Sequence, residues 1–248
     1  MSNPANAAKM KYLILFTGLL GAMLRWALYL TGTDSKNLLV SGHWAHYAIW
    51  ILTAGVILLL AFTCFGIKTG ENMRSRTAPV GSLGCFLAAA AFVRISLRDF
   101  SAAGSNLETA ASLLGFGAAL SLGWVGVCRL RRTRPIFLCH GLVCLAFALR
   151  MVCQYRIWSS DPQLQDYCFI MLAHVGLMLT SYYLAEFDAG MGRHRPTWFL
   201  GLLAAYLSLL CLKGSEPLFM LCCGLWVLTN LPLLPRRRPA AIAKETNS

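Results

Sequence analysis

The protein has 248 residues, of which 57% are hydrophobic and only 13% are charged. Soluble domains are about one quarter charged, so this composition excludes an ordinary soluble domain. The formal net charge of +12 would suit a nucleic-acid-binding protein, but the basic residues lie in the loops between apolar runs. We therefore expect membrane lipids as partners and no nucleic acid.

Eight apolar runs follow one another along the chain, each close to the roughly 20 residues that a helix needs to cross a bilayer. We predict an all-α membrane protein, a polytopic bundle of about eight transmembrane helices. It forms a single integral membrane domain over 1–248, with a short N-terminal segment (1–11), the spans (12–234) and a basic tail (235–248). The predicted spans cover residues 12–31, 45–67, 79–97, 109–128, 135–155, 166–186, 197–212 and 217–234.

The Lys and Arg residues are distributed unequally between the two sides of this bundle. Fifteen fall on the side that holds both chain ends, four fall on the other side, and three arginines lie inside the runs. Because cytoplasmic loops favour Lys and Arg, we expect a multi-pass cell-membrane protein with both termini in the cytoplasm. An odd number of spans would place one terminal basic cluster outside, so the charge bias also favours an even number.

Three arginines lie inside odd-numbered runs, near the predicted outer end of each. They are Arg25, Arg94 and Arg150, spaced 69 and 56 residues apart, and each is followed by a polar loop containing an acidic residue. Lys213, 63 residues further on, begins a looser fourth copy. This spacing indicates four parallel helical hairpins, a weak internal repeat.

A charge inside a span costs from a few to more than about ten kcal/mol, so these arginines are candidate ligand-binding residues. If their helices turn these faces inward, three guanidinium groups converge on an outward-facing cavity that binds a carboxylate, a phosphate or a lipid headgroup. In the alternative interpretation the arginines snorkel to the interface or pair with acidic residues of the outer loops. The acidic residues available for such pairing are Asp34, Asp99 and Asp161.

His174 is the histidine nearest the centre of a predicted span, and it is the fourth candidate ligand-binding residue. It suits a proton relay or an acid–base role. A relay lacks partners, however, because no Asp or Glu lies in the middle of a run, and a neutral histidine hydrogen-bonded between helices is the alternative. The sequence contains no catalytic, nucleotide or metal motif, so we expect no catalytic residue, metal site or cofactor.

Small residues and cysteines complete the pattern. Small side chains form stripes on the third and fourth runs, which predicts tight helix contacts inside the bundle or, alternatively, a homodimer interface. Most of the ten cysteines lie in apolar runs and behave as small hydrophobic residues, although Cys153 and Cys168 flank an outer loop and would pair in an oxidising environment. The stripes comprise Gly81, Gly84, Cys85, Ala88 and Ala89, then Gly115, Ala119, Gly123 and Gly126.

An arginine ahead of an acidic loop is clearest in the first hairpin, LRWALYLTGTDSKNLLVSGHW. This arrangement resembles a pattern in uncharacterised multi-pass membrane proteins of Gram-positive anaerobes, a resemblance that implies no activity. Three hypotheses follow. The first is a membrane-embedded binding or transport module for a small anionic or polar solute. The second is a non-catalytic membrane subunit or sensor that works with a partner protein, and the third is a lipid-modifying membrane enzyme using His174.

Overall fold

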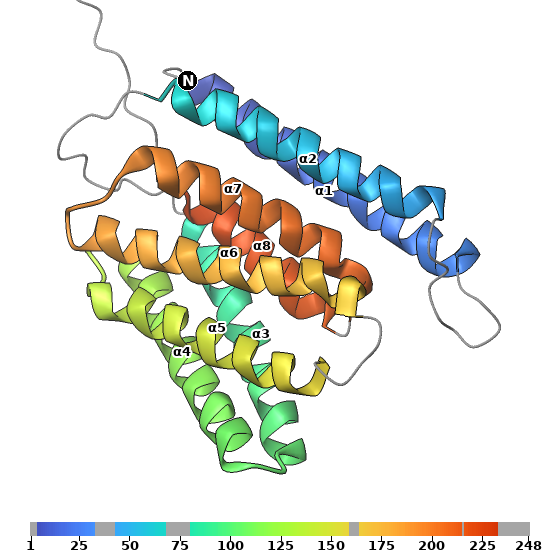
Figure 1. Ribbon diagram of the computed structural model, residues 1–248. Coiled ribbons are helices and arrows are strands. Elements are labelled where there is room, and N and C mark those ends of the chain that lie inside the picture. Colours follow the sequence, from blue (N-terminus) through green and yellow to red (C-terminus); the bar gives the residue numbers. More distant parts are fainter. Residues whose placement is uncertain (1–3, 33–42, 68–79, 159–163, 215, 233–248) are drawn as a thin grey trace, which may run out of the picture.

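A computed structural model describes residues 4–32, 43–67, 80–158, 164–214 and 216–232 (Figure 1). All regular secondary structure in these residues is helical, and each long helix overlaps one predicted apolar run. The first helix begins at Pro4, upstream of the predicted start at residue 12. The helices are α1 (Pro4–Thr31), α2 (Trp44–Phe65), α3 (Val80–Ala102), α4 (Asn106–Leu130), α5 (Phe137–Trp158), α6 (Leu164–Asp188), α7 (His194–Leu210), the short 3₁₀ helix η1 (Cys211–Lys213) and α8 (Pro217–Asn230).

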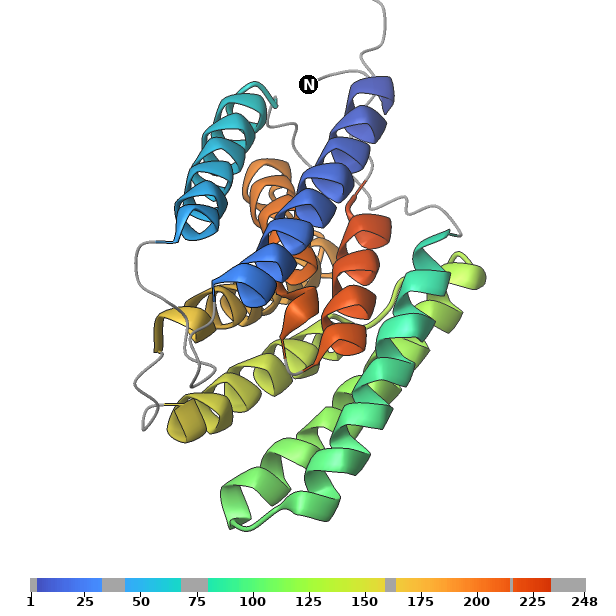
Figure 2. The same cartoon turned by 90° about the vertical axis from the view of Figure 1, so that its right-hand side faces the viewer.

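Seven of the described helices are long and apolar enough to cross a membrane. The eighth, α8, has 14 residues and is about 21 Å long, which is shorter than a hydrocarbon core of about 30 Å. It packs on α3 and α7 and is largely buried between them (Figure 2). Its length is therefore set by neighbouring helices, which shield its backbone, rather than by contact with lipid.

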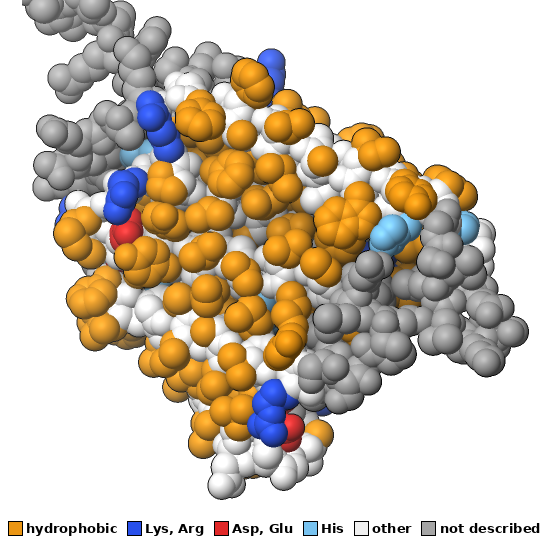
Figure 3. Space-filling view, viewed as in Figure 1, with side chains coloured by type: hydrophobic (Ala, Val, Ile, Leu, Met, Phe, Trp, Pro, Cys, Tyr) orange, Lys and Arg blue, Asp and Glu red, His pale blue; other side chains and the backbone are white. Residues whose placement is uncertain are grey.

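The surface of the bundle is apolar where a soluble protein would be polar. Phe62 is 83% exposed, Leu120 is 78% exposed and Tyr12 is 72% exposed. Hydrophobic side chains cover most of the face seen in Figure 3, and charged side chains lie near its two ends. Apolar helices with so large an exposed apolar surface indicate a multi-pass membrane protein.

Six helices form a closed ring of neighbours. Each of α3, α4, α5, α6 and α7 packs on the next helix, and α8 packs back on α3. The α1–α2 hairpin packs on α7, outside the ring (Figures 1 and 2). Consecutive helices run in opposite directions, so the ends of α3 and α5 meet the start of α8. We call this the Glu216 end, and the opposite end, where α6 finishes, the Asp188 end.

Small residues of both stripes lie in helix contacts, as predicted, although a Cβ added to Gly123 would meet nothing within 4 Å. A Cβ added to Gly84 of α3 would lie 2.0 Å from Oγ1 of Thr229 in α8. A Cβ added to Gly115 of α4 would lie 2.1 Å from Oγ of Ser96 in α3. The stripes thus bring α3 close to both α4 and α8 within one chain.

All ten cysteines lie in the described residues, and all are free thiols. Cys153 and Cys168 therefore do not form the disulfide that an oxidising environment would allow. The described helices are held together without a disulfide bond.

Candidate functional site

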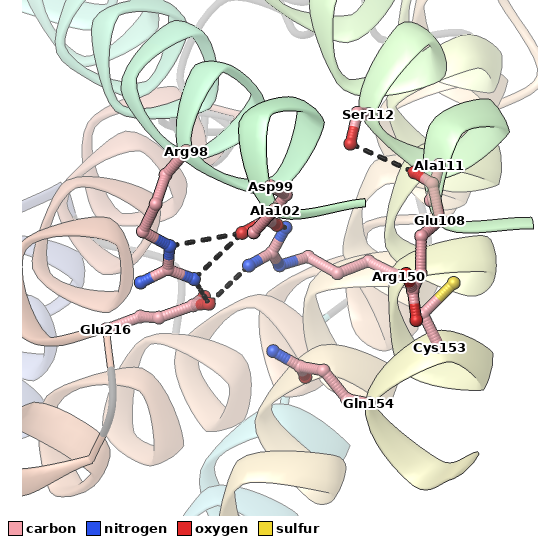
Figure 4. Close-up of a pocket in the computed structure, with 10 residues that line it drawn as sticks. All are labelled: Arg98, Asp99, Ala102, Glu108, Ala111, Ser112, Arg150, Cys153, Gln154 and Glu216. Atoms are coloured by element: carbon pink, nitrogen blue, oxygen red, sulfur yellow. Dashed lines mark hydrogen bonds and ion pairs between the residues drawn. The ribbon is translucent and has the colours of Figure 1, made fainter. Parts of the chain in front are cut away.

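A pocket of about 210 Å³ lies at the Glu216 end, between the last turns of α3 and α5, the first turns of α4 and the residue that precedes α8 (Figure 4). At about 30 Å³ per molecule in the liquid, it has room for roughly seven waters. Seven of its ten lining residues are polar or charged, in contrast to the apolar surface of the bundle. The lining residues are Arg98, Asp99, Ala102, Glu108, Ala111, Ser112, Arg150, Cys153, Gln154 and Glu216.

Four of these residues form a continuous ion-pair network, which we call the four-charge network: Arg98, Asp99, Arg150 and Glu216. Nη2 of Arg98 donates to Oδ1 of Asp99 at 2.9 Å and to Oε1 of Glu216 at 2.6 Å. Nη1 of Arg150 donates to Oδ2 of Asp99 at 2.6 Å, and its Nη2 donates to Oε1 of Glu216. Each guanidinium group therefore contacts both carboxylates, as Figure 4 shows.

The local sequence places Glu216 where its carboxylate is free to join this network. Pro217 occupies the first position of α8, where its fixed φ favours a helix start and its missing N–H costs nothing. Glu216 is the residue before it, and its side chain does not cap the helix. The carboxylate instead turns to the arginines, and only 5% of the side chain is exposed. A helix start therefore positions a buried acid opposite the ends of α3 and α5.

Three polar atoms at the pocket wall are buried without a hydrogen-bond partner among the described residues. They are Nε of Arg150, Oε1 of Gln154 and Oε2 of Glu216. Each buried unpaired group costs about 1–3 kcal/mol, so native proteins usually satisfy such groups with water or with a ligand. The site thus has hydrogen-bonding capacity that the described residues do not fill.

The structure separates the three candidate arginines. Arg150 belongs to the four-charge network, and its 2.6 Å contact with Asp99 is one of the pairings that the alternative interpretation named. Arg25 is 1% exposed, and its Nη1 donates to Sγ of Cys211 at 3.5 Å, away from the pocket lining. Arg94 is exposed on α3 and does not line the pocket. The other two acids named for pairing, Asp34 and Asp161, lie outside the described residues.

His174 lies in an aromatic cluster beneath the four-charge network. Its Nδ1 donates to the carbonyl oxygen of Ile170 at 2.8 Å, and its Nε2 is buried without a partner among the described residues. Its ring centroid lies 6.2 Å from that of Phe147 and 6.4 Å from that of Phe219. The Arg150 guanidinium lies 5.1 Å from the Phe219 ring. Phe219 therefore contacts both the histidine and the network, while His174 itself does not line the pocket.

Sequence reasoning missed Arg98, Asp99 and Glu216 as members of one site. It assigned Arg98 and Glu216 to outer loops, and their charges were counted only to assign the membrane topology. The available signal was the acidic residue that follows each cation along the chain, because opposite charges at the same end of adjacent helices tend to pair. That signal does not reveal which hairpins are adjacent, and the ring closure between α3 and α8 supplies this information.

A second buried polar pair lies at the Asp188 end. Nδ1 of His140 in α5 lies 2.6 Å from Oδ2 of Asp188 in α6, with 0% and 5% of the side chains exposed. The His140 ring stacks near Trp226 of α8, with centroids 6.2 Å apart. This contact ties α5 to α6 and α8. Within the described residues, no group of three or more His, Cys, Asp and Glu side chains is arranged to hold a metal ion.

The fold and the pocket together define the class of protein: a multi-pass helical membrane protein with a charged pocket at one end of its bundle. No protein-family model, curated protein or solved structure matches the chain. Its function must therefore be argued from the pocket itself.

Proposed function

We propose that the protein is a membrane-embedded binding or transport module for a small polar solute, which occupies the pocket at the Glu216 end. The observation that carries the proposal is the convergence of four charged side chains, from α3, α5 and the start of α8, on one pocket that retains unpaired polar atoms. Burying charges costs several kcal/mol each even when they are paired. Arg150 and Glu216 are largely buried at this cost beside a cavity, and a cavity on which a few polar groups converge is the usual form of a ligand site.

A contact whose only role is to hold helices together would differ from this charged pocket in two ways. Apolar residues of similar volume join helices at least as strongly as buried ion pairs do. Such a contact also leaves no space beside it, because protein interiors are close-packed. Here the side chains instead surround space for roughly seven waters, and the pocket lining includes small residues that keep it open, among them Ala111 and Ser112.

The proposal includes an orientation. We infer eight crossings of the cell membrane with both termini in the cytoplasm, which puts the Glu216 end and its pocket on the outer side. Support comes from the fifteen basic residues on the side of the chain ends against four on the other. Four parallel hairpins remain our interpretation of the spacing of the intramembrane cations, and the α1–α2, α3–α4, α5–α6 and α7–α8 pairs are its units.

A variant that fills the pocket without removing a charge tests this function. Ala111→Leu adds volume to the pocket wall, whereas Ala90→Leu makes the same change on an exposed face of α3. The measurement is the shift in unfolding temperature of the detergent-purified protein across a panel of small amino acids, amines, carboxylates and polyols. We expect at least one solute to raise the unfolding temperature of the wild type and of Ala90→Leu but not that of Ala111→Leu. A panel without any stabilising solute, or an equal response from Ala111→Leu, would contradict the proposal.

Binding and transport are then distinguished in proteoliposomes. The solute identified by stabilisation is supplied outside vesicles that contain the wild type or Ala111→Leu. Uptake by the wild type alone indicates a transporter, and saturable binding without uptake indicates a binding module.

A further inference from the structure

We infer that the solute carries a primary ammonium group, which the pocket binds through Glu108, Glu216 and Gln154. This inference rests on the proposed function and names the chemistry of the ligand. The sequence, in which three arginines were expected to converge, had favoured an anionic solute instead.

The charge of the pocket favours a cation. Two arginines and three carboxylates line it, which leaves one net negative charge. Both arginines are balanced by Asp99 and Glu216 in the four-charge network. The remaining carboxylate is Glu108, which forms no ion pair within the described part of the chain. The uncompensated negative charge therefore lies on α4, across the pocket from the network.

The arginines are poorly placed to receive an anion. Each guanidinium already donates to both Asp99 and Glu216. An incoming carboxylate or phosphate would compete with these two acids for the guanidinium groups, and the negative charges of Asp99, Glu216 and Glu108 would repel it. The only donor of Arg150 that is buried without a partner in the described chain is Nε, which offers an anion a single hydrogen bond, while the three carboxylates of the lining repel it. The pocket thus disfavours anions despite its arginines.

Two of the three unpaired atoms at the pocket wall are acceptors, which favours a ligand that donates hydrogen bonds. Oε1 of Glu216 accepts from both arginines, which leaves Oε2 of the same carboxylate without a partner. Oε1 of Gln154 is likewise unpaired among the described residues. Both side chains line the pocket, and their broad terminal torsions allow these oxygens to turn toward a bound ligand. An ammonium group has three donors and no acceptor, which matches these acceptors and the negative charge.

Glu108 can bind the ammonium group because its negative charge is not needed to stabilise the fold. It lies in the first turn of α4, where its Oε2 accepts the backbone N–H of Gly104 at 2.8 Å. The amide oxygen of a glutamine can accept the same bond. Glu108→Gln therefore removes the net negative charge while leaving the four-charge network and the helix start in place.

The ammonium group has two plausible sources, which are a free small amine or amino acid and the headgroup of an aminophospholipid. Both share the chemistry argued above, and both reach a pocket near a membrane surface. A free amine would bind in any lipid environment, whereas a headgroup would already occupy the pocket in a membrane that contains it.

The test uses the purified full chain in detergent, with ethanolamine, choline and acetate as probes at fixed ionic strength. Ethanolamine and choline both carry a cation and a hydroxyl, but choline has no N–H donor. We expect ethanolamine to bind at least about tenfold more tightly than choline or acetate, and Glu108→Gln to weaken it about tenfold. The control is Glu186→Gln, which makes the same change at the Asp188 end and should leave binding unaltered.

The outcomes separate this inference from the proposed function. If acetate or a neutral solute binds the wild type and not Ala111→Leu, while ethanolamine binds no better than choline, the ammonium inference is wrong and the pocket function stands. If no probe and no panel solute responds to Ala111→Leu, both are wrong. Once ethanolamine binding is seen, nanodiscs distinguish the two sources. If the lipid headgroup is the ligand, ethanolamine binding is blocked in phosphatidylethanolamine discs and retained in phosphatidylcholine discs. If a free amine is the ligand, ethanolamine binds in both.

Discussion

The carboxylate of Glu216 accepts both arginines of the four-charge network on one oxygen, and its other oxygen is buried without a partner in the described chain. This single side chain links α3, α5 and α8 at the Glu216 end of the bundle. Its two cations differ in environment, since the Arg150 side chain is 12% exposed and that of Arg98 is 54% exposed. Solvent screens the second pair far more than the first.

This difference predicts unequal costs of truncation. Glu216→Ala leaves the buried Arg150 with Asp99 alone and should destabilise the protein by about 3 kcal/mol. Arg98→Ala removes an exposed partner and should cost at most about 1 kcal/mol. Unfolding of both variants in detergent by a denaturing surfactant, followed by tryptophan fluorescence, measures the two values. Equal costs would show that burial does not govern the network.

His174 offers a second prediction, because its Nε2 is buried without a partner in the described residues. An apolar side chain of similar volume removes that unsatisfied group and loses one bond to the Ile170 carbonyl. His174→Leu should therefore unfold within about 1 kcal/mol of the wild type, on either side. Solute binding by this variant should also be unchanged, since His174 does not line the pocket. Loss of binding in a folded His174→Leu would restore the acid–base hypothesis.

The approach of α3 to α8 depends on the absence of a side chain at Gly84. A Cβ there would lie 2.0 Å from Oγ1 of Thr229 and 3.1 Å from the backbone Cα of Trp226, so the Thr229 side chain would have to move and the two backbones would have to shift slightly apart. Gly84→Ala should destabilise the protein by about 1–3 kcal/mol. Gly123→Ala in α4, where a Cβ meets nothing within 4 Å, should instead stabilise it by up to about 1 kcal/mol. The same surfactant titration compares them, and a shared sign would contradict this packing.

The number and order of the helices were the best predicted feature, because hydrocarbon demands long apolar helices and the loops interrupt them with charge. The runs at 79–97 and 166–186 become α3 (Val80–Ala102) and α6 (Leu164–Asp188), each longer by about one turn. The extra turns hold Arg98, Asp99 and Asp188, which a hydropathy criterion counts as loop. Arg98 and Asp99 form an ion pair with each other there, and Asp188 pairs with His140.

Which helices become neighbours was beyond the sequence pattern. The repeat treated Arg25, Arg94 and Arg150 as equivalent, but the α1–α2 hairpin lies outside the six-helix ring and Arg94 is exposed. Equivalent sequence positions thus fall in unlike environments. The site is assembled by the closure of the ring between α3 and α8, and this long-range pairing leaves no periodic signal in the chain.

The whole molecule has polar groups concentrated at the two ends of an apolar bundle. The four-charge network marks one end and the His140–Asp188 pair the other, with the aromatic cluster of Phe92, Phe147 and Phe219 between them. The Phe219 ring lies 5.1 Å from the Arg150 guanidinium, so this cluster adjoins the network without lining the pocket. Passage of a solute along the bundle from the pocket would require these aromatic side chains to move.

The proposed orientation makes a prediction for intact cells. Asn106, at the start of α4, and Arg134, between α4 and α5, are both exposed and lie at opposite ends of the bundle. Asn106→Cys should react with a membrane-impermeant maleimide added to whole cells, because it lies at the end proposed to be outside. Arg134→Cys should react only after permeabilisation, and the wild type, with its ten native thiols, gives the background. Reversed labelling would put the pocket on the cytoplasmic side, and labelling of both in intact cells would mean that the bundle does not separate the two faces.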